Sequence, residues 1–99
     1  METYVVGTIA RNTAESGRIR GVIDRLTPEG YEFTAGPDHY RFTKPGRIES
    51  VITEMVPVCE DHGLDVEAFR LVEYRKNNDT ERSRYEGGKV VREDDGPLN

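Results

Sequence analysis

The residues best suited to nucleophilic or metal chemistry lie close together in the sequence. Cys59 and His62 are three positions apart with Glu60 and Asp61 between them, and His39 is the other histidine. Cysteine, histidine and carboxylate side chains are zinc ligands, but no C-x-x-C or H-E-x-x-H spacing is present. Cys59 falls at the centre of the apolar positions of an expected helix, where a free cysteine behaves as a small hydrophobe. The sequence therefore predicts Cys59 as a core residue and predicts no metal site.

Catalysis by the same residues is not supported. A Cys–His pair needs an exposed thiol with a lowered pKa, whereas the negative end of a helix dipole near Cys59 disfavours the thiolate. Two histidines single out no Ser-His-Asp set, and no pair of carboxylates is distinguished from the many others. We therefore predict a protein that is not an enzyme, with no catalytic residues and no cofactor.

Basic residues and tyrosines are interspersed in the first half of the chain. Arginine and tyrosine on a sheet face are a known means of stacking bases and binding phosphates. Acidic residues are interleaved in equal number, so cross-strand ion pairs on a solvated face explain the pattern without a ligand. A nucleotide or nucleic-acid binder is thus the alternative hypothesis, with these residues as its site: Arg18, Arg20, Tyr40, Arg41, Lys44 and Arg47.

Gly46 stands at the expected start of a helix between Lys44 and Arg47. A helix N-terminus flanked by bases suits a single anion. With one glycine only, a simple capped turn is the favoured interpretation.

An acidic surface is the counterpart in the second half of the chain. Exposed carboxylates on one arc of a helix can guide docking on a basic partner, although most such arcs are simply solvated. The principal hypothesis is therefore a non-catalytic protein-interaction module, of the kind of phage or mobile-element inhibitors and adaptors that dock on a nucleic-acid-binding surface. Its partner-binding residues would be Glu49, Glu54, Glu60, Asp61, Asp65 and Glu67.

Charge and composition exclude several classes of function. The 99 residues carry a formal net charge of −5, with seven basic and seven acidic residues in 1–50 but seven and twelve in 51–99. This balance disfavours attraction of the whole protein to nucleic acid or an anionic membrane. A single cysteine, no membrane-length apolar run and no signal-like start lead us to expect a cytoplasmic protein.

One helix–strand unit organises the predicted fold. Apolar residues recur at helical spacing over 46–62, and Gly63 suits the position after the helix. Pro57 lies on the solvent arc, so a continuous bent helix is favoured over two short helices broken at Val56. A strand over 66–74, apolar on both faces, is expected to return along the sheet.

Four strands are predicted before this helix. They cover 4–11, 19–26, 31–34 and 40–43, with turns at 27–30 and 35–38. The alternation of Ile19, Gly21 and Ile23 with the intervening residues predicts the strand over 19–26. Gly7 in the first strand suggests a bulge or the close approach of another backbone.

The remaining sequence has little to bury. Residues 77–99 are rich in charge, Asn, Gly and Ser, which predicts a flexible polar tail following a single domain over 1–76. A weak hairpin over 83–91, formed on a partner, is the less favoured alternative. The fold class is α+β: an antiparallel sheet of four to five strands in the order β-β-β-β-α-β, with one long helix on one face. One helix leaves the other face bare, so a protein partner or a homo-oligomer is expected to cover it.

Overall fold

The computed structural model describes residues 2–10, 16–64, 69–77 and 79–92. Within them the chain is α+β, as predicted, but it has two helices and more strands than expected. In chain order the elements are β1 (Thr3–Ala10), α1 (Ser16–Leu26), the 3-10 helix η2 (Thr27–Glu29), β2 (Glu32–Ala35), β3 (His39–Pro45), α2 (Ile48–Asp61), β4 (Phe69–Arg75), β5 (Glu81–Glu86) and β6 (Lys89–Arg92).

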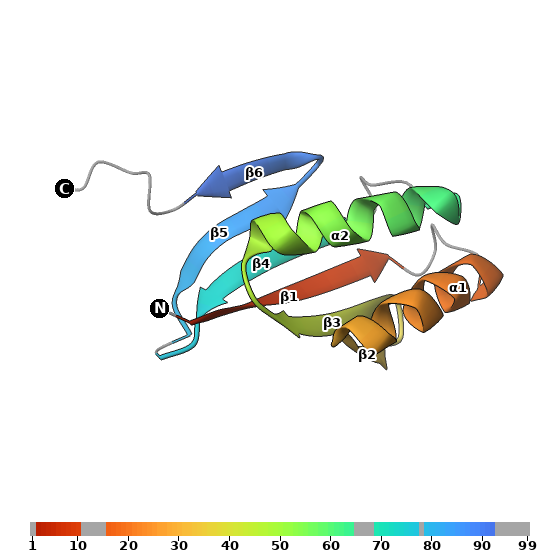
Figure 1. Cartoon of the computed structure of the whole chain (residues 1–99), viewed down its shortest axis with the longest axis horizontal. Helices are drawn as coiled ribbons and strands as arrows, with labels where there is room; N and C mark the ends of the chain where they lie inside the picture. Colours follow the sequence, from red (N-terminus) through yellow and green to blue (C-terminus); the bar gives the residue numbers. More distant parts are fainter. Residues whose placement is uncertain (1, 11–15, 65–68, 78, 93–99) are drawn as a thin grey trace.

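The strands form one six-stranded antiparallel sheet in the described part of the chain. Their spatial order is β2-β3-β1-β4-β5-β6, so β1 and β4 lie at the centre. The first four strands and the two helices follow the split β-α-β arrangement, and β5 and β6 extend the sheet on one side. Both helices lie on the same side of the sheet, with α1 near β2 and β3 and α2 over the central strands (Figure 1).

The hydrophobic core fills the layer between these helices and the sheet. α2 contributes Ile48, Val51, Met55, Val58 and Cys59, all of them buried. The sheet, α1 and the connections contribute the other buried apolar residues: Val5, Ile9, Ile19, Val22, Leu26, Tyr31, Phe42, Leu64, Phe69, Leu71 and Tyr85.

The prediction of a strand over 19–26 was wrong, because these residues belong to α1. Ile19, Val22 and Leu26 follow helical spacing and are all buried, whereas the alternation that suggested a strand placed Ile19 with Gly21. A Cβ on Gly21 would lie 2.5 Å from the His62 ring. The glycine therefore permits close packing of α1 against the end of α2. This packing favours a helix over a strand for these residues.

The helix predicted over 46–62 is present, but it is not the long helix that was expected. α2 spans 14 residues, continues through Pro57, and is preceded by Arg47 as N-cap instead of Gly46. Pro57 is exposed, as its place on the solvent arc predicted. Gly63 has φ of 75°, the left-handed conformation expected after a helix end.

The C-terminal prediction needs a larger correction. β5 and β6, within the region expected to be a tail, pair with β4 and with each other, so the sheet extends to Arg92. Few apolar residues suffice here because, among hairpin residues 81–91, only Ser83 and Tyr85 are buried. Of the strand predicted over 66–74, β4 confirms the part from Phe69 onward, and 66–68 and 93–99 lie outside the described residues.

Candidate functional site

The sheet face opposite the helices carries the most extended surface feature of the described residues, here named the open face. Strand pairing aligns its residues in three rows across the sheet in the order β2-β3-β1-β4-β5-β6. The first row consists of Thr34, Arg41, Thr8, Arg70, Glu86 and Lys89. The second row consists of Glu32, Thr43, Val6, Val72, Arg84 and Val91. The third row does not include the outer strands β2 and β6 and consists of Pro45, Tyr4, Tyr74 and Glu81.

The centre of the open face is apolar. Tyr4 and Tyr74 stack with ring centroids 5.4 Å apart, and Val6 pairs with Val72 in the adjacent row. All four side chains are partly exposed. The Tyr4 hydroxyl donates a 2.8 Å hydrogen bond to Asp79, and this bond is the main cause of the raised pKa of Tyr4. The two tyrosines and two valines are named the apolar midline.

Charged residues surround the apolar midline. Arg70 forms an ion pair with Glu86 at 3.7 Å, and the Arg84 Nε donates to Glu81 at 2.7 Å. Arg41 has no ion-pair partner among the described residues. The open face therefore combines a central apolar patch with a polar surround, the anatomy of a protein interface.

The residues predicted for the alternative ligand site do not converge. Arg18 donates to the Gly63 carbonyl at the end of α2, and Lys44 donates to the Glu29 carbonyl at 2.6 Å with its ammonium 5.3 Å from the Tyr31 ring centroid. Both therefore hold the fold together. Arg20 and Tyr40 line a shared hollow of about 260 Å³ beside α1. Arg47 forms an ion pair with Glu49 at 3.7 Å, and Arg41 lies on the open face.

The start of α2 is occupied by an anion from the protein itself. No side chain caps the helix locally; instead the Ile48 N–H donates to the Glu73 carboxylate at 2.8 Å. Glu73 is fully buried on β4, and its second oxygen lies 3.5 Å from the Arg82 guanidinium. A negative charge here is stabilised by the positive end of the helix dipole. The anion site considered near Gly46 is thus replaced by an internal carboxylate.

The predicted acidic surface is partly compensated within the chain. Asp61 pairs with Arg25 at 3.1 Å, and Glu54 accepts a 2.8 Å hydrogen bond from the Tyr31 hydroxyl, which together with burial raises the pKa of that tyrosine. Glu49 lies beside Arg47, whereas Glu60 is exposed. Asp65 and Glu67 lie outside the described residues.

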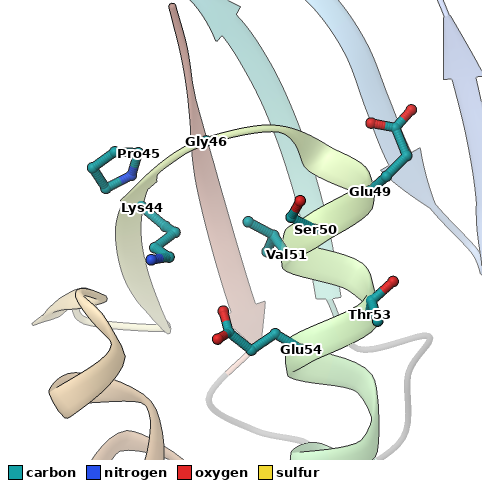
Figure 2. A pocket seen from close by; sticks show the side chains of 8 residues that line it. All are labelled: Lys44, Pro45, Gly46, Glu49, Ser50, Val51, Thr53 and Glu54. Carbon is teal, nitrogen blue, oxygen red and sulfur yellow. The ribbon is translucent and has the colours of Figure 1, made fainter.

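A hollow of about 590 Å³ runs along the first turns of α2. Lys44 and Glu54 extend into the space between β3 and α2, whereas Glu49 extends from the other side of the helix (Figure 2). The lining is completed by Pro45, Gly46, Ser50, Val51 and Thr53. In this hollow Lys44 faces Glu54, whose carboxylate already accepts the hydrogen bond from the Tyr31 hydroxyl.

Cys59 is a core residue, with its side chain fully buried. Burial raises the pKa of its thiol to about 12. The His62 ring is oriented by its Nδ1, which lies 3.0 Å from the Val58 carbonyl oxygen and donates to it when Nδ1 carries the proton. In the described ranges, no three His, Cys, Asp or Glu residues are placed to hold a metal ion.

We expect the Cys59 thiol to be protected from alkylation in the native protein. At about pH 8, an exposed thiol is partly ionised and reacts readily, whereas a buried protonated thiol reacts only after opening of the structure. Labelling followed by mass spectrometry should show a rate that rises with denaturant in step with unfolding. Stoichiometric labelling under native conditions at the rate of a free thiol would contradict the burial of this side chain.

Sequence reasoning indicated an uncovered sheet face but did not identify its residues. The signal was that strands over 4–11 and 66–74 are apolar on both sides. Which side chains become neighbours depends on the register between β1 and β4.

No helix in the described ranges is long and apolar enough to cross a membrane. Searches for a matching protein-family model, curated protein or solved structure found none.

Proposed function

We propose that this chain is a non-catalytic protein-interaction module that binds its partner on the open face. The observation that carries the proposal is the one-sided architecture: α1 and α2 both cover the same face of the sheet (Figure 1). The opposite face leaves the apolar midline partly exposed to water. Covering apolar surface is favourable by about 25 cal/mol per Å², so a partner that fits this face gains binding free energy.

The open face is a better supported docking surface than the acidic arc of α2. Three of the four described carboxylates of that arc already interact with Arg25, Arg47 or Tyr31. A basic partner would have to compete with these contacts, and exposed ion pairs contribute only about 0 to 1 kcal/mol each. The docking of a basic nucleic-acid-binding partner on this arc therefore has less support.

Nucleic acid is also less well supported as the ligand of the open face. Two of its arginines are paired with glutamates, and Asp79 accepts the Tyr4 hydroxyl hydrogen bond at one end of the apolar midline. These carboxylates oppose a phosphate backbone, whose binding relies on uncompensated positive charge. The alternating charges instead suit a protein surface.

Replacing Val72 with lysine is expected to abolish partner binding, because it puts a charge in the centre of the apolar midline. The long lysine side chain lets the charged group reach water in the unbound protein, so the fold should be retained. The matched control is Glu60→Lys, which adds the same side chain on the exposed side of α2. Proteins captured from the native host by wild type and both variants would be identified, and the binding would be repeated with purified components.

Loss of binding with Val72→Lys and retention with Glu60→Lys supports the open face. The reverse pattern would return the acidic arc of α2 as the docking surface and overturn the proposal. Salt-sensitive binding of a single-stranded oligonucleotide that Val72→Lys leaves unchanged or strengthens, because the added ammonium attracts phosphate, would likewise overturn it in favour of the nucleic-acid hypothesis. Circular dichroism of each variant verifies that the fold is retained.

A further inference from the structure

Resting on the proposed function, we infer that the partner on the open face is a second copy of this chain, packed face to face about a two-fold axis. The axis runs parallel to the strands and passes between β1 and β4. The sheet favours such an axis because three strands lie on each side of this line. The interface is then isologous, with the same surface used by both copies.

This symmetry superposes the two apolar midlines. Rotation about the axis places β1 over β4 of the second copy and leaves the three rows in their order. Val6 then faces the second copy's Val72, and Tyr4 faces the second copy's Tyr74. The central part of the interface is consequently apolar on both sides, with aromatic rings that are typical of interface centres.

The charges of the open face are self-complementary in this arrangement. β3 lies over β5 of the second copy, so Arg41 faces the second copy's Glu86, and the two-fold axis generates this contact twice. Each Glu86 is then shared between Arg70 of its own chain and Arg41 of the other copy. Arg41 is the arginine of this face that has no ion-pair partner among the described residues. No like charges face each other: the other opposed pairs are Thr34 with Lys89, Glu32 with Val91, Thr43 with Arg84, Pro45 with Glu81 and Thr8 with Arg70.

The other face-to-face two-fold arrangement is unfavourable. An axis in the plane of the sheet but perpendicular to the strands would place each strand over its own copy and reverse the rows. Arg84 would then face the second copy's Arg84, and Glu86 would face the second copy's Glu81. Like charges placed opposite each other are destabilising, so the axis parallel to the strands is selected. Aligned sheets of this kind cross at roughly 30° because each is twisted.

The size of the open face indicates a reversible dimer. With strands spaced by about 4.8 Å and rows by roughly 7 Å, two rows across six strands and a third row across four cover about 540 Å² per copy. The total of about 1,100 Å² falls in the range of weak, transient protein interfaces, just below the roughly 1,200 Å² of stable ones. We therefore expect micromolar dissociation constants and a dimer fraction that rises with concentration.

The test uses two charge-reversal variants, Arg41→Glu and Glu86→Arg, measured alone and mixed. Alone, each variant opposes like charges at both symmetry-related contacts, and its dimer should be weakened by at least about tenfold. Mixed, the two chains restore opposite charges at both contacts, because Glu at 41 meets Arg at 86 and the native Arg41 meets the native Glu86. Residues 41 and 86 lie on strands about 14 Å apart within one chain, so the rescue cannot be internal. Sedimentation equilibrium over about 1 to 300 µM brackets the expected affinity.

Recovery of a mixed dimer from two weakened variants supports the inferred arrangement. A wild-type dimer that neither variant weakens would overturn it. A wild-type chain that stays monomeric also overturns it, but leaves the proposed function intact if Val72→Lys still abolishes binding of a different protein. If the chain is monomeric and Val72→Lys changes no binding, both proposals fail.

Discussion

Replacing Glu73 with alanine is expected to lower the free energy of unfolding by about 3 to 5 kcal/mol, the usual cost of breaking a buried ion pair by removing one partner. The carboxylate is fully buried and accepts the Ile48 N–H at the start of α2. Its removal leaves that N–H without its acceptor and leaves Arg82, which is 19 % exposed, without this counter-charge. For a domain whose total stability is about 5 to 15 kcal/mol, this is a large fraction. Chemical denaturation at equilibrium measures the change.

Two variants separate the components of this effect. Glu73→Gln keeps an oxygen acceptor for the Ile48 N–H but loses the charge, so it should be destabilised by less than Glu73→Ala. Asp61→Ala removes a carboxylate from an exposed pair with Arg25 and should cost about 0 to 1 kcal/mol. Equal losses for Glu73→Ala and Asp61→Ala would show that Glu73 is not the cap of α2.

Replacing Gly7 with alanine is expected to cost about 3 kcal/mol through overpacking. A Cβ at this position would lie 2.2 Å from ring carbons of Phe42 and 2.8 Å from Leu71. Phe42 is 1 % exposed and its ring packs against the rings of Tyr31 and Phe33, so it has no space to move away. The loss should be evident as a lower denaturation midpoint with an unchanged dependence on denaturant concentration.

The double variant Gly7→Ala/Phe42→Leu tests the assigned cause. A smaller side chain at position 42 makes room for the new methyl group, so the two losses should not add. Residues in direct contact show coupling energies of about 0.5 to 3 kcal/mol. Additive losses would mean that Gly7 is required by the backbone and not by the Phe42 ring.

The prediction at Gly7 was wrong in its detail. A glycine inside a strand pattern indicates a bulge or the close approach of another backbone. The structure has no register shift at Gly7, and the group that comes close is the Phe42 side chain, which faces it on β3. Which residue faces a glycine depends on strand register, and a strand on its own does not contain that information.

α1 shows how an ambiguous pattern is resolved by packing. Ile19, Val22, Ile23 and Leu26 satisfy helical spacing, but three β-branched residues and Gly21 have low helix propensity and suggested a strand. The helix forms because its apolar side is buried against the sheet and because Gly21 admits His62. Tertiary packing commonly supplies more of a helix's stability than propensity does.

The β5–β6 hairpin was predicted only as the less favoured alternative, a weak hairpin over 83–91 formed on a partner, for a related reason. Its residues are mostly polar, and Val90 and Val91 are 41 % and 52 % exposed. The pairing of its backbone with β4 places it in the sheet, and backbone hydrogen bonds are independent of side-chain hydrophobicity. Hydropathy alone therefore could not indicate it.

By itself, the sequence determined those features that arise from local periodicity and local backbone preference. These are the α+β class, the continuous helix through Pro57, the glycine stop at Gly63, and Cys59 as a core residue. Each depends on residues that are neighbours along the chain, so their spacing is sufficient.

Only the tertiary structure decided the features that depend on distant residues. In the sequence, Glu73 is indistinguishable from an ordinary polar strand residue. It is buried because the start of α2 and Arg82, both distant in sequence, compensate the charge of its carboxylate. The apolar midline likewise exists because β1 and β4 pair in one register, which brings Tyr4 to Tyr74 and Val6 to Val72. Side-chain direction alternates along a strand, so a shift of one residue would turn these side chains toward the helices.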